Sequence, residues 1–218
     1  MYKYVKRFFD FVFALIGIIV LSPLFLILIL LIKLDSRGPI LFVQKRIGMN
    51  KKYFNILKFR TMSIDTPKDT PTHLLENPEQ YITKVGRFLR KTSLDELPQV
   101  WNILVGDMSI IGPRPALWNQ YDLIEERDKY GANNVRPGLS GWAQINGRDE
   151  LLIQDKAKLD GEYVVKMSFL FDAKCFIYTI LSVLKHQGVI EGGTGALDRN
   201  DSISVASDED IHEENIIL

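Results

Sequence analysis

The chain has 218 residues, of which 46% are hydrophobic, so it can form one folded domain of moderate size, with or without a membrane anchor. Its 27 basic and 27 acidic residues balance, but seven acidic residues and one basic residue lie between Asp198 and the C-terminus, which leaves the rest of the chain basic. A basic body suits anionic partners such as phosphates, lipid headgroups or nucleic acid. The single cysteine, Cys175, excludes an internal disulfide and a thiolate metal site, and the three histidines are too far apart in sequence for a typical metal motif.

The first predicted element is an apolar segment without a charged residue, from Phe11 to Ile32. A run of about 20 apolar residues is long enough to span a bilayer as a helix. It is too long for the apolar part of a usual signal peptide, and no small-x-small cleavage site precedes Lys33. The segment therefore predicts a membrane anchor.

Two features of this anchor favour a hairpin over a simple span. Ser22-Pro23 interrupts the run near its centre, where proline kinks or breaks a helix and the serine hydroxyl can satisfy a freed carbonyl. Both flanks are basic, and basic flanks are typical of the cytoplasmic side. The basic flanking residues are Lys3, Lys6 and Arg7 before the run, and Lys33, Arg37, Lys45, Arg46, Lys51 and Lys52 after it. We expect a re-entrant helix-break-helix hairpin; a kinked transmembrane helix is the alternative.

The remainder of the chain predicts an α-rich α+β fold. Two short strands, Ile40–Val43 and Tyr53–Phe59, flank Gly48-Met49-Asn50 and predict a small β-hairpin. Helices are expected over Tyr81–Lys91, Leu97–Leu104, Trp118–Tyr130, Leu151–Val165 and Phe169–Leu184. The last of these is strongly apolar but too short to span, so it fits an interfacial or core helix. The segments 112–115 and 136–148, rich in glycine and proline, are expected to be loops.

The most informative polar segment contains the adjacent carboxylates Asp95 and Glu96. Because proline is best tolerated in the first helical turn, Pro98 places a helix start near Asp95, with free N–H groups that attract anions. One carboxylate could bind Mg²⁺ while the other attacks phosphorus. The alternative is purely structural, because Ser93-x-x-Glu96 is also a capping box.

Two loop arginines next to prolines form a second candidate group. Arg114 lies between Pro113 and Pro115, and Arg136 precedes Pro137. The planar guanidinium matches phosphate oxygens in two-point contact, although either side chain could be an ordinary surface charge. Trp142 could stack on a nucleobase or lie in the core.

Eight motifs occur in a fixed order along the chain. They are Lys6-Arg7-x-x-Asp10, Ser22-Pro23, Gln44-x-Arg46-x-Gly48, Lys58-Phe59-Arg60-Thr61-Met62, Ser93-Leu94-Asp95-Glu96-Leu97-Pro98-Gln99, Gly106-Asp107-Met108-Ser109, Gly112-Pro113-Arg114-Pro115 and Arg136-Pro137-Gly138-x-x-Gly141-Trp142-Ala143-Gln144-x-Asn146-Gly147-Arg148. From residue 3 to about residue 190, the chain closely resembles the bacterial sugar transferase family, in its small form, the monotopic phosphoglycosyl transferases.

The resemblance implies a Mg²⁺-dependent reaction through a covalent intermediate. Asp95 would attack the β-phosphate of a UDP-sugar and release UMP, while Glu96 would bind Mg²⁺. Polyprenyl (undecaprenyl) phosphate would then take the phosphosugar from Asp95. Such an enzyme works at the cytoplasmic face of the bacterial cell membrane, in the first membrane step of capsule, exopolysaccharide or glycoconjugate synthesis. Its expected partners are membrane lipids and downstream glycosyltransferases, and no nucleic acid.

The resemblance also implies further site residues. Lys58 and Arg90 would contact phosphate, and Arg114, Arg136 and Arg148 match basic positions around the same pocket.

The implied division of the chain has three parts. Residues 1–34 would form the re-entrant anchor with its break at Ser22-Pro23, and residues 35–190 the catalytic domain. Residues 191–218, rich in glycine and then acidic, are expected to be disordered.

The main rival from another class is a membrane-tethered basic scaffold or binding protein without catalysis. It would need the basic surface but not the carboxylate pair. A lipid-phosphate phosphatase would share the anchor and the acids but would release inorganic phosphate. A nucleic-acid binder would gain nothing from a charge-free hairpin. Release of UMP from a UDP-sugar separates these classes.

Overall fold

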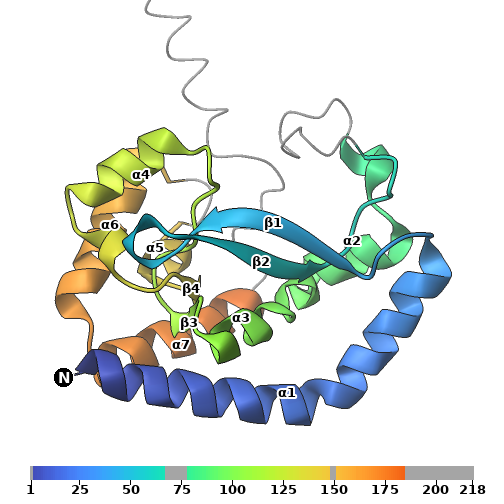
Figure 1. Ribbon diagram of the computed structural model, residues 1–218, viewed down its shortest axis with the longest axis horizontal. Helices are drawn as coiled ribbons and strands as arrows, with labels where there is room; N and C mark the ends of the chain where they lie inside the picture. Colours follow the sequence, from blue (N-terminus) through green and yellow to red (C-terminus); the bar gives the residue numbers. More distant parts are fainter. Residues whose placement is uncertain (1, 67–77, 148–150, 185–218) are drawn as a thin grey trace, which may run out of the picture.

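The computed structural model describes residues 2–66, 78–147 and 151–184. Its first element is the long helix α1 (Tyr2–Asp35), which runs along one edge of the molecule and then turns to follow a second edge (Figure 1). Both ends of this helix contact the rest of the chain. Near its start, Lys6 Nζ lies 2.7 Å from Asp172 Oδ2, and at its end Asp35 Oδ2 accepts a hydrogen bond of 3.0 Å from the amide of Val85.

The helix α1 continues through Ser22-Pro23 and bends along its length, whereas the sequence predicts two helices separated at this pair. Pro23 has no N–H to donate to the carbonyl of Ile19, four residues earlier. The Ser22 hydroxyl donates to that carbonyl instead, across 2.8 Å. The only carbonyl that the proline must leave unpaired is thereby satisfied, so a bend is possible without a break.

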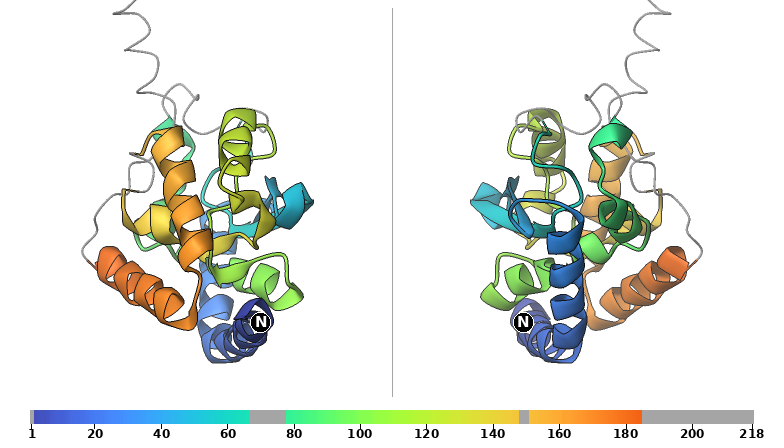
Figure 2. Two further views of the ribbon diagram at one scale, coloured as in Figure 1. Left: turned by 90° about the vertical axis from the view of Figure 1, so that its left-hand side faces the viewer. Right: turned by 90° about the vertical axis from the view of Figure 1, so that its right-hand side faces the viewer.

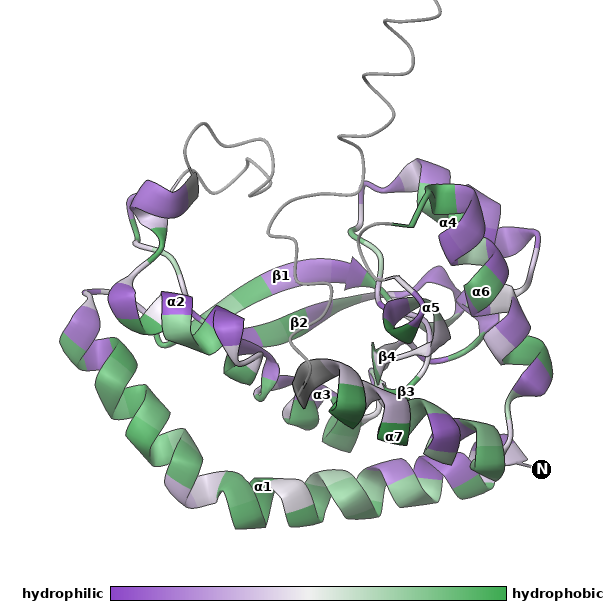
Figure 3. Cartoon of the chain, turned by 180° about the vertical axis from the view of Figure 1, so that it is seen from behind, coloured by the Kyte–Doolittle hydropathy of each residue, from purple (hydrophilic) through white to green (hydrophobic). Residues whose placement is uncertain are grey.

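Most of the surface of α1 is apolar and uncovered. Of the described helices, α1 is the one long and apolar enough to cross a membrane, and 11% of its most apolar window is buried inside the protein. The hydrophobic colouring of Figure 3 dominates the middle of the helix, whereas hydrophilic residues appear toward both of its ends. Such a surface suits lipid and not water.

The predicted β-hairpin is confirmed. Strands β1 (Leu41–Ile47) and β2 (Tyr53–Phe59) are antiparallel, with Leu41 opposite Phe59 and Ile47 opposite Tyr53. The turn η1 (Met49–Lys51) uses two left-handed residues, Asn50 and Lys51, at φ values of 55° and 59°.

The remaining elements alternate short helices with two short strands. In chain order they are η3 (Pro78–Tyr81), α2 (Lys84–Lys91), η4 (Leu94–Glu96), α3 (Gln99–Val105), β3 (Ser109–Ile111), α4 (Tyr121–Asp128), η5 (Ala132–Asn134), β4 (Gly138–Ser140), α5 (Trp142–Ile145), α6 (Ile153–Lys166) and α7 (Phe169–Leu184). The bounds of α7 agree with those predicted from the sequence, and the bounds of α6 nearly agree. The helices predicted over residues 81–91 and 118–130 correspond to α2 and α4, and both are shorter than predicted.

The parallel pairing of β3 with β4 was not predicted. Both strands are three residues long and come from the segments around the glycine- and proline-rich loops. A Cβ added at Gly138 would lie 2.1 Å from the amide nitrogen of Gly112, so the close approach of these two segments requires glycine.

The two halves of α1 pack on two different parts of the core. The first cluster comprises Ala14, Ile56, Ile103 and Met108, and the second comprises Leu28, Ile32, Phe59 and Leu89. Strand β2 contributes Ile56 to one cluster and Phe59 to the other. The hairpin therefore joins both halves of α1 to one body. In both end views of Figure 2, α7 and the N-terminal half of α1 lie at the same end of the molecule.

Candidate active site

The two adjacent carboxylates lie on the 3₁₀ turn η4, which immediately precedes α3. The sequence predicts that the helix begins near Asp95; α3 instead begins at Gln99. Ser93 adopts a left-handed conformation (φ 56°) and makes no side-chain capping hydrogen bond. The capping-box interpretation is therefore wrong, and Glu96 is free of that role.

Glu96 is held by two cations from distant segments. Its Oε1 lies 2.8 Å from Lys58 Nζ of β2 and 2.7 Å from Arg114 Nη2, and Arg114 Nη1 lies 3.5 Å from its Oε2. Burial alone would raise the pKa of Glu96, but Arg114 and Lys58 outweigh it and hold the pKa well below its usual range. Glu96 is therefore ionised at any physiological pH.

Asp95 differs from its neighbour in having no such partner. Within the described residues, no hydrogen-bond donor is paired with its carboxylate. Burial raises the pKa of Asp95 above its usual 3.8 and Glu96 adds to the rise, while Lys58, Arg90 and Arg114 oppose it. An unpaired carboxylate among cations is suited to attack an electrophile that carries negative charge.

A further cation lies near this pair. Arg90 Nε donates to Thr61 Oγ1 across 2.9 Å, and its charge, like those of Lys58 and Arg114, lowers the pKa of Asp95. Arg114, Lys58 and Arg90, all expected at the site, therefore lie near the carboxylate pair.

Arg46 was missed as a site residue. Its Nη1 donates to the carbonyl of Pro115 (3.0 Å) and its Nη2 to Gln44 Oε1 (2.7 Å). Its Nε is buried and has no partner within the described chain. Burial first, and then Arg114, lower the pKa of Arg46 to about 10. The motif Gln44-x-Arg46-x-Gly48 was the available signal, but nothing in that motif indicates where the side chain points.

Two other predicted residues remain, and the structure describes only Arg136. Arg136 Nε donates to the carbonyl of Gly106 across 2.9 Å, at the far end of α3 from Glu96. Arg148 lies outside the described residues. A role for either in substrate binding stays a prediction.

Trp142 has a structural role. Its Nε1 donates to Glu162 Oε2 across 2.9 Å, and its ring centre lies 5.0 Å from that of Phe171. Its ring therefore packs between α5, α6 and α7, which supports the core alternative over a stacking platform.

The carboxylate pair can serve as part of a Mg²⁺ site. Among the described residues, no three His, Cys, Asp or Glu side chains cluster. Mg²⁺ typically takes one or two carboxylates and completes its shell with phosphate oxygens and water. Glu96 Oε2, which has only the long contact with Arg114, and the unpaired Asp95 fit this limited donor set.

Comparison with known proteins places this chain in a family. Residues 1–186 match the family described as Bacterial sugar transferase. The chain is 41% identical over 185 residues to an undecaprenyl-phosphate glucose phosphotransferase from Komagataeibacter xylinus, and it spans about a third (35%) of that protein. It is 40% identical over 184 residues to the uncharacterized sugar transferase EpsL from Bacillus subtilis, covering 84% of this chain and 89% of that one.

A third relative, from Escherichia coli, is a UDP-glucose:undecaprenyl-phosphate glucose-1-phosphate transferase, 40% identical over 186 residues. The aligned residues cover 82% of this chain and 40% of the relative. The family match, over residues 1–186, contains α1 and the carboxylate pair. The chain belongs to the bacterial sugar transferase family.

Proposed function

We propose that the chain transfers a sugar-1-phosphate from a UDP-sugar to polyprenyl (undecaprenyl) phosphate and releases UMP. The observation that carries this proposal is the asymmetry of the carboxylate pair: Glu96 is fixed by Lys58 and Arg114, while Asp95 has no described donor. Family membership and the activities for which the relatives from K. xylinus and E. coli are named support the same reaction.

The reaction has two displacements at phosphorus. Asp95 attacks the β-phosphorus of the UDP-sugar, the bond from that phosphorus to the bridging oxygen breaks, and UMP leaves with the electron pair. A phosphate oxygen of polyprenyl phosphate then attacks the same phosphorus and displaces the Asp95 carboxylate. The products are UMP and a polyprenyl-diphosphate sugar, and Asp95 is regenerated.

The cations around the pair have separate tasks in this scheme. Arg90 and Arg46 lie where they can neutralise phosphate oxygens, and Lys58 and Arg114 fix Glu96. Mg²⁺, held by Glu96 together with phosphate oxygens and water, would supply further neutralisation of the phosphate charge.

We also propose that α1 enters the membrane from the cytoplasmic face and returns to it. In support, both ends of α1 are bonded to the same body, and both halves pack on it through β2. Exposed apolar side chains of α3 and α7, such as Trp101, Val105 and Phe176, add to the uncovered surface of α1. Such an arrangement keeps the lipid acceptor and the soluble donor at one plane.

The test uses the purified full-length chain, a panel of UDP-sugars and undecaprenyl phosphate. We expect UMP release that depends on the lipid, and, without lipid, a mass increase of the protein by one sugar phosphate. Release of inorganic phosphate would indicate a phosphatase, and no turnover with any donor would indicate a binding protein. The panel should include UDP-glucose and UDP-N-acetylgalactosamine, because relatives are named for glucose and for N-acetylgalactosamine transfer.

A further inference from the structure

A second cationic pocket lies at the C-terminal end of α3, opposite to Glu96. Its lining includes Lys3, Lys6, Arg7, Asp10 and Arg136. Helix α3 has seven residues, so its two ends are about 10 Å apart. None of the cations around Glu96 lines this pocket, so an anion bound here is not the phosphate that Asp95 attacks.

Two arginines of the pocket are fixed by the end of α3. Arg7 donates to the carbonyls of Ile103 (2.6 Å) and Leu104 (2.8 Å), and Arg136 Nε donates to that of Gly106 (2.9 Å). Cations at a helix C-terminus are favourable because they satisfy its last carbonyls and complement its dipole. These contacts leave the terminal nitrogens of Arg136 without a hydrogen-bond partner among the described residues.

The acidic residues near the pocket are already engaged. Asp10 accepts from the Ser109 hydroxyl (2.7 Å) and the amide of Ile110 (3.0 Å). Asp172 accepts from Lys6, and also from the hydroxyls of Tyr2 and Tyr163.

The charge that remains is positive. Four bases (Lys3, Lys6, Arg7 and Arg136) and one acid (Asp10) line the pocket, Asp172 pairs with Lys6 from outside the lining, and Lys3 has no described partner. The pocket therefore has an excess of positive charge together with unused donors, which suits an anion with several acceptor oxygens.

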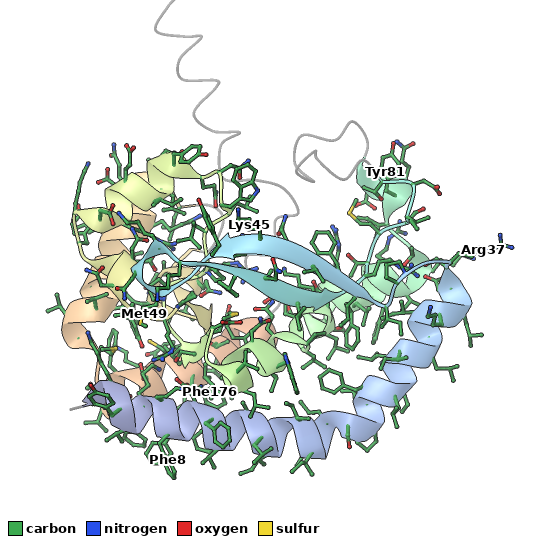
Figure 4. The ribbon with its side chains drawn as sticks, in the orientation of Figure 1. Phe8, Arg37, Lys45, Met49, Tyr81 and Phe176 are labelled. Carbon is green, nitrogen blue, oxygen red and sulfur yellow. The ribbon has the colours of Figure 1, made fainter. Side chains whose placement is uncertain are left out.

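The pocket borders the apolar surface that the membrane would cover. Phe8 is 64% exposed and Leu170 80%, and the rings of Phe9 and Phe169 lie 6.2 Å apart between α1 and α7. In Figure 4, Phe8 lies on the outer side of α1, and Met49, which lines the pocket, lies on the inner side near the same end. The bilayer surface is therefore the nearest source of an anion for this pocket.

We propose that this pocket binds the phosphate of an anionic membrane lipid, with the headgroup at Lys3 and Arg136 and the acyl chains along α1 and α7. This proposal rests on the membrane placement of α1 proposed above and not on the chemistry at Asp95. A lipid held here would fix the first turns of α1 at the membrane surface.

The test measures lipid binding by native mass spectrometry of the full-length chain in a zwitterionic detergent, without UDP-sugar. The ligands are dioctanoyl phosphatidylglycerol, dioctanoyl phosphatidylcholine and glycerol phosphate. We expect one phosphatidylglycerol per chain, and at least about tenfold weaker binding of phosphatidylcholine and of glycerol phosphate.

Matched variants locate the site. Lys3→Gln and Arg136→Gln should each weaken phosphatidylglycerol binding about fivefold to tenfold. Lys33→Gln removes the same charge from the other end of α1 and should leave binding unchanged. Lys3 is exposed, so the melting temperature of Lys3→Gln without lipid should equal that of the wild type.

Three results would overturn the proposal. Equal binding of phosphatidylcholine would show that charge is not recognised. An equal loss in Lys33→Gln would show general surface electrostatics. Equal binding of glycerol phosphate would show a site for soluble phosphate. Because no donor substrate is present, these outcomes are independent of whether UMP release is observed.

Discussion

The Arg114 guanidinium donates to the Glu96 carboxylate across 2.7 Å and joins the loop Gly112–Pro115 to the turn before α3. Prolines on both sides of Arg114 restrict its backbone, so less conformational freedom is lost when the contact forms. Because Lys58 binds the same carboxylate oxygen, Glu96 is fixed from two directions. The neighbouring Asp95 is left as the carboxylate available for reaction.

Asp95→Asn should lower UMP release by roughly a thousandfold or more while the protein still folds and inserts. The amide keeps the shape of the carboxylate but is a far weaker nucleophile at phosphorus. UMP release and the sugar-phosphate mass increase should both disappear. Asp155→Asn, an exposed acid in the first turn of α6, is the control and should behave as the wild type. Substantial turnover in Asp95→Asn would exclude Asp95 as the nucleophile.

Glu96→Gln should reduce the rate and raise the Mg²⁺ concentration required, because a neutral amide is a poor ligand for Mg²⁺. Lys58 and Arg114 would also lose their ionised partner, which should lower the free energy of unfolding by about 1–2 kcal/mol. The loss is this small because water reaches Arg114 and screens its charge. A Mg²⁺ titration of UMP release and a melting curve check both effects. A titration curve that coincides with the wild type would remove Glu96 from the metal site.

The acid limb of the pH–rate profile should lie above the ordinary aspartate value of 3.8, because burial raises the pKa of Asp95. As the pH falls through that raised pKa, Asp95 becomes protonated and activity is lost. Lys58→Gln removes a cation that lowers the pKa of Asp95, so the limb should move to higher pH. Single-turnover rates between about pH 4 and pH 8 test this. Lys51→Gln, an exposed lysine paired with Asp128, should not move the limb, and a downward shift in Lys58→Gln would contradict the assignment.

The two ends of α1 should lie on the same, cytoplasmic side. The test places single cysteines after Met1 and at Ser36 in a Cys175→Ala background and labels intact cells with an impermeant maleimide. Burial raises the pKa of the Cys175 thiol to about 11, so the native thiol reacts poorly even before it is removed. Both introduced cysteines should be protected until the cells are lysed.

Pro23→Ala is the matched contrast in the same assay. It restores the donor to the Ile19 carbonyl and should straighten α1, so that part of the population exposes its N-terminal cysteine outside. Labelling of the N-terminal cysteine in the otherwise unaltered chain, with Ser36 protected, would show a transmembrane helix.

Arg127→Met should lower the free energy of unfolding by about 3–5 kcal/mol, because it leaves Asp160 charged and buried without its partner. Arg127 Nε and Nη2 lie 2.8 and 2.5 Å from Asp160 Oδ2, and the two side chains are 4% and 1% exposed. The double variant Arg127→Met/Asp160→Leu should recover most of the loss. Denaturant titrations measure both, and UMP release by the double variant should stay near wild type, since this pair joins α4 to α6 away from Asp95.

The sequence by itself determined the elements whose residues interact within a few positions of one another. The bounds of α7, the β-hairpin and the apolar length of α1 follow from local hydrophobic patterns and turn residues, which need no distant partner to be recognised. The same is true of Ser22, whose hydroxyl bonds a carbonyl three residues away. The adjacent carboxylates were also evident from their motif.

The tertiary structure alone decided which partners those carboxylates and cations have. Glu96 could cap a helix or bind distant cations, and only the packing of β2 and the Arg114 loop against the turn selected the second. Arg136, which its neighbouring proline groups with Arg114 in the sequence, is placed by the β3–β4 pairing at the other end of α3. A side chain's partners depend on chain segments tens of residues away, and the free energy of pairing a buried charge arises only when folding brings those segments together.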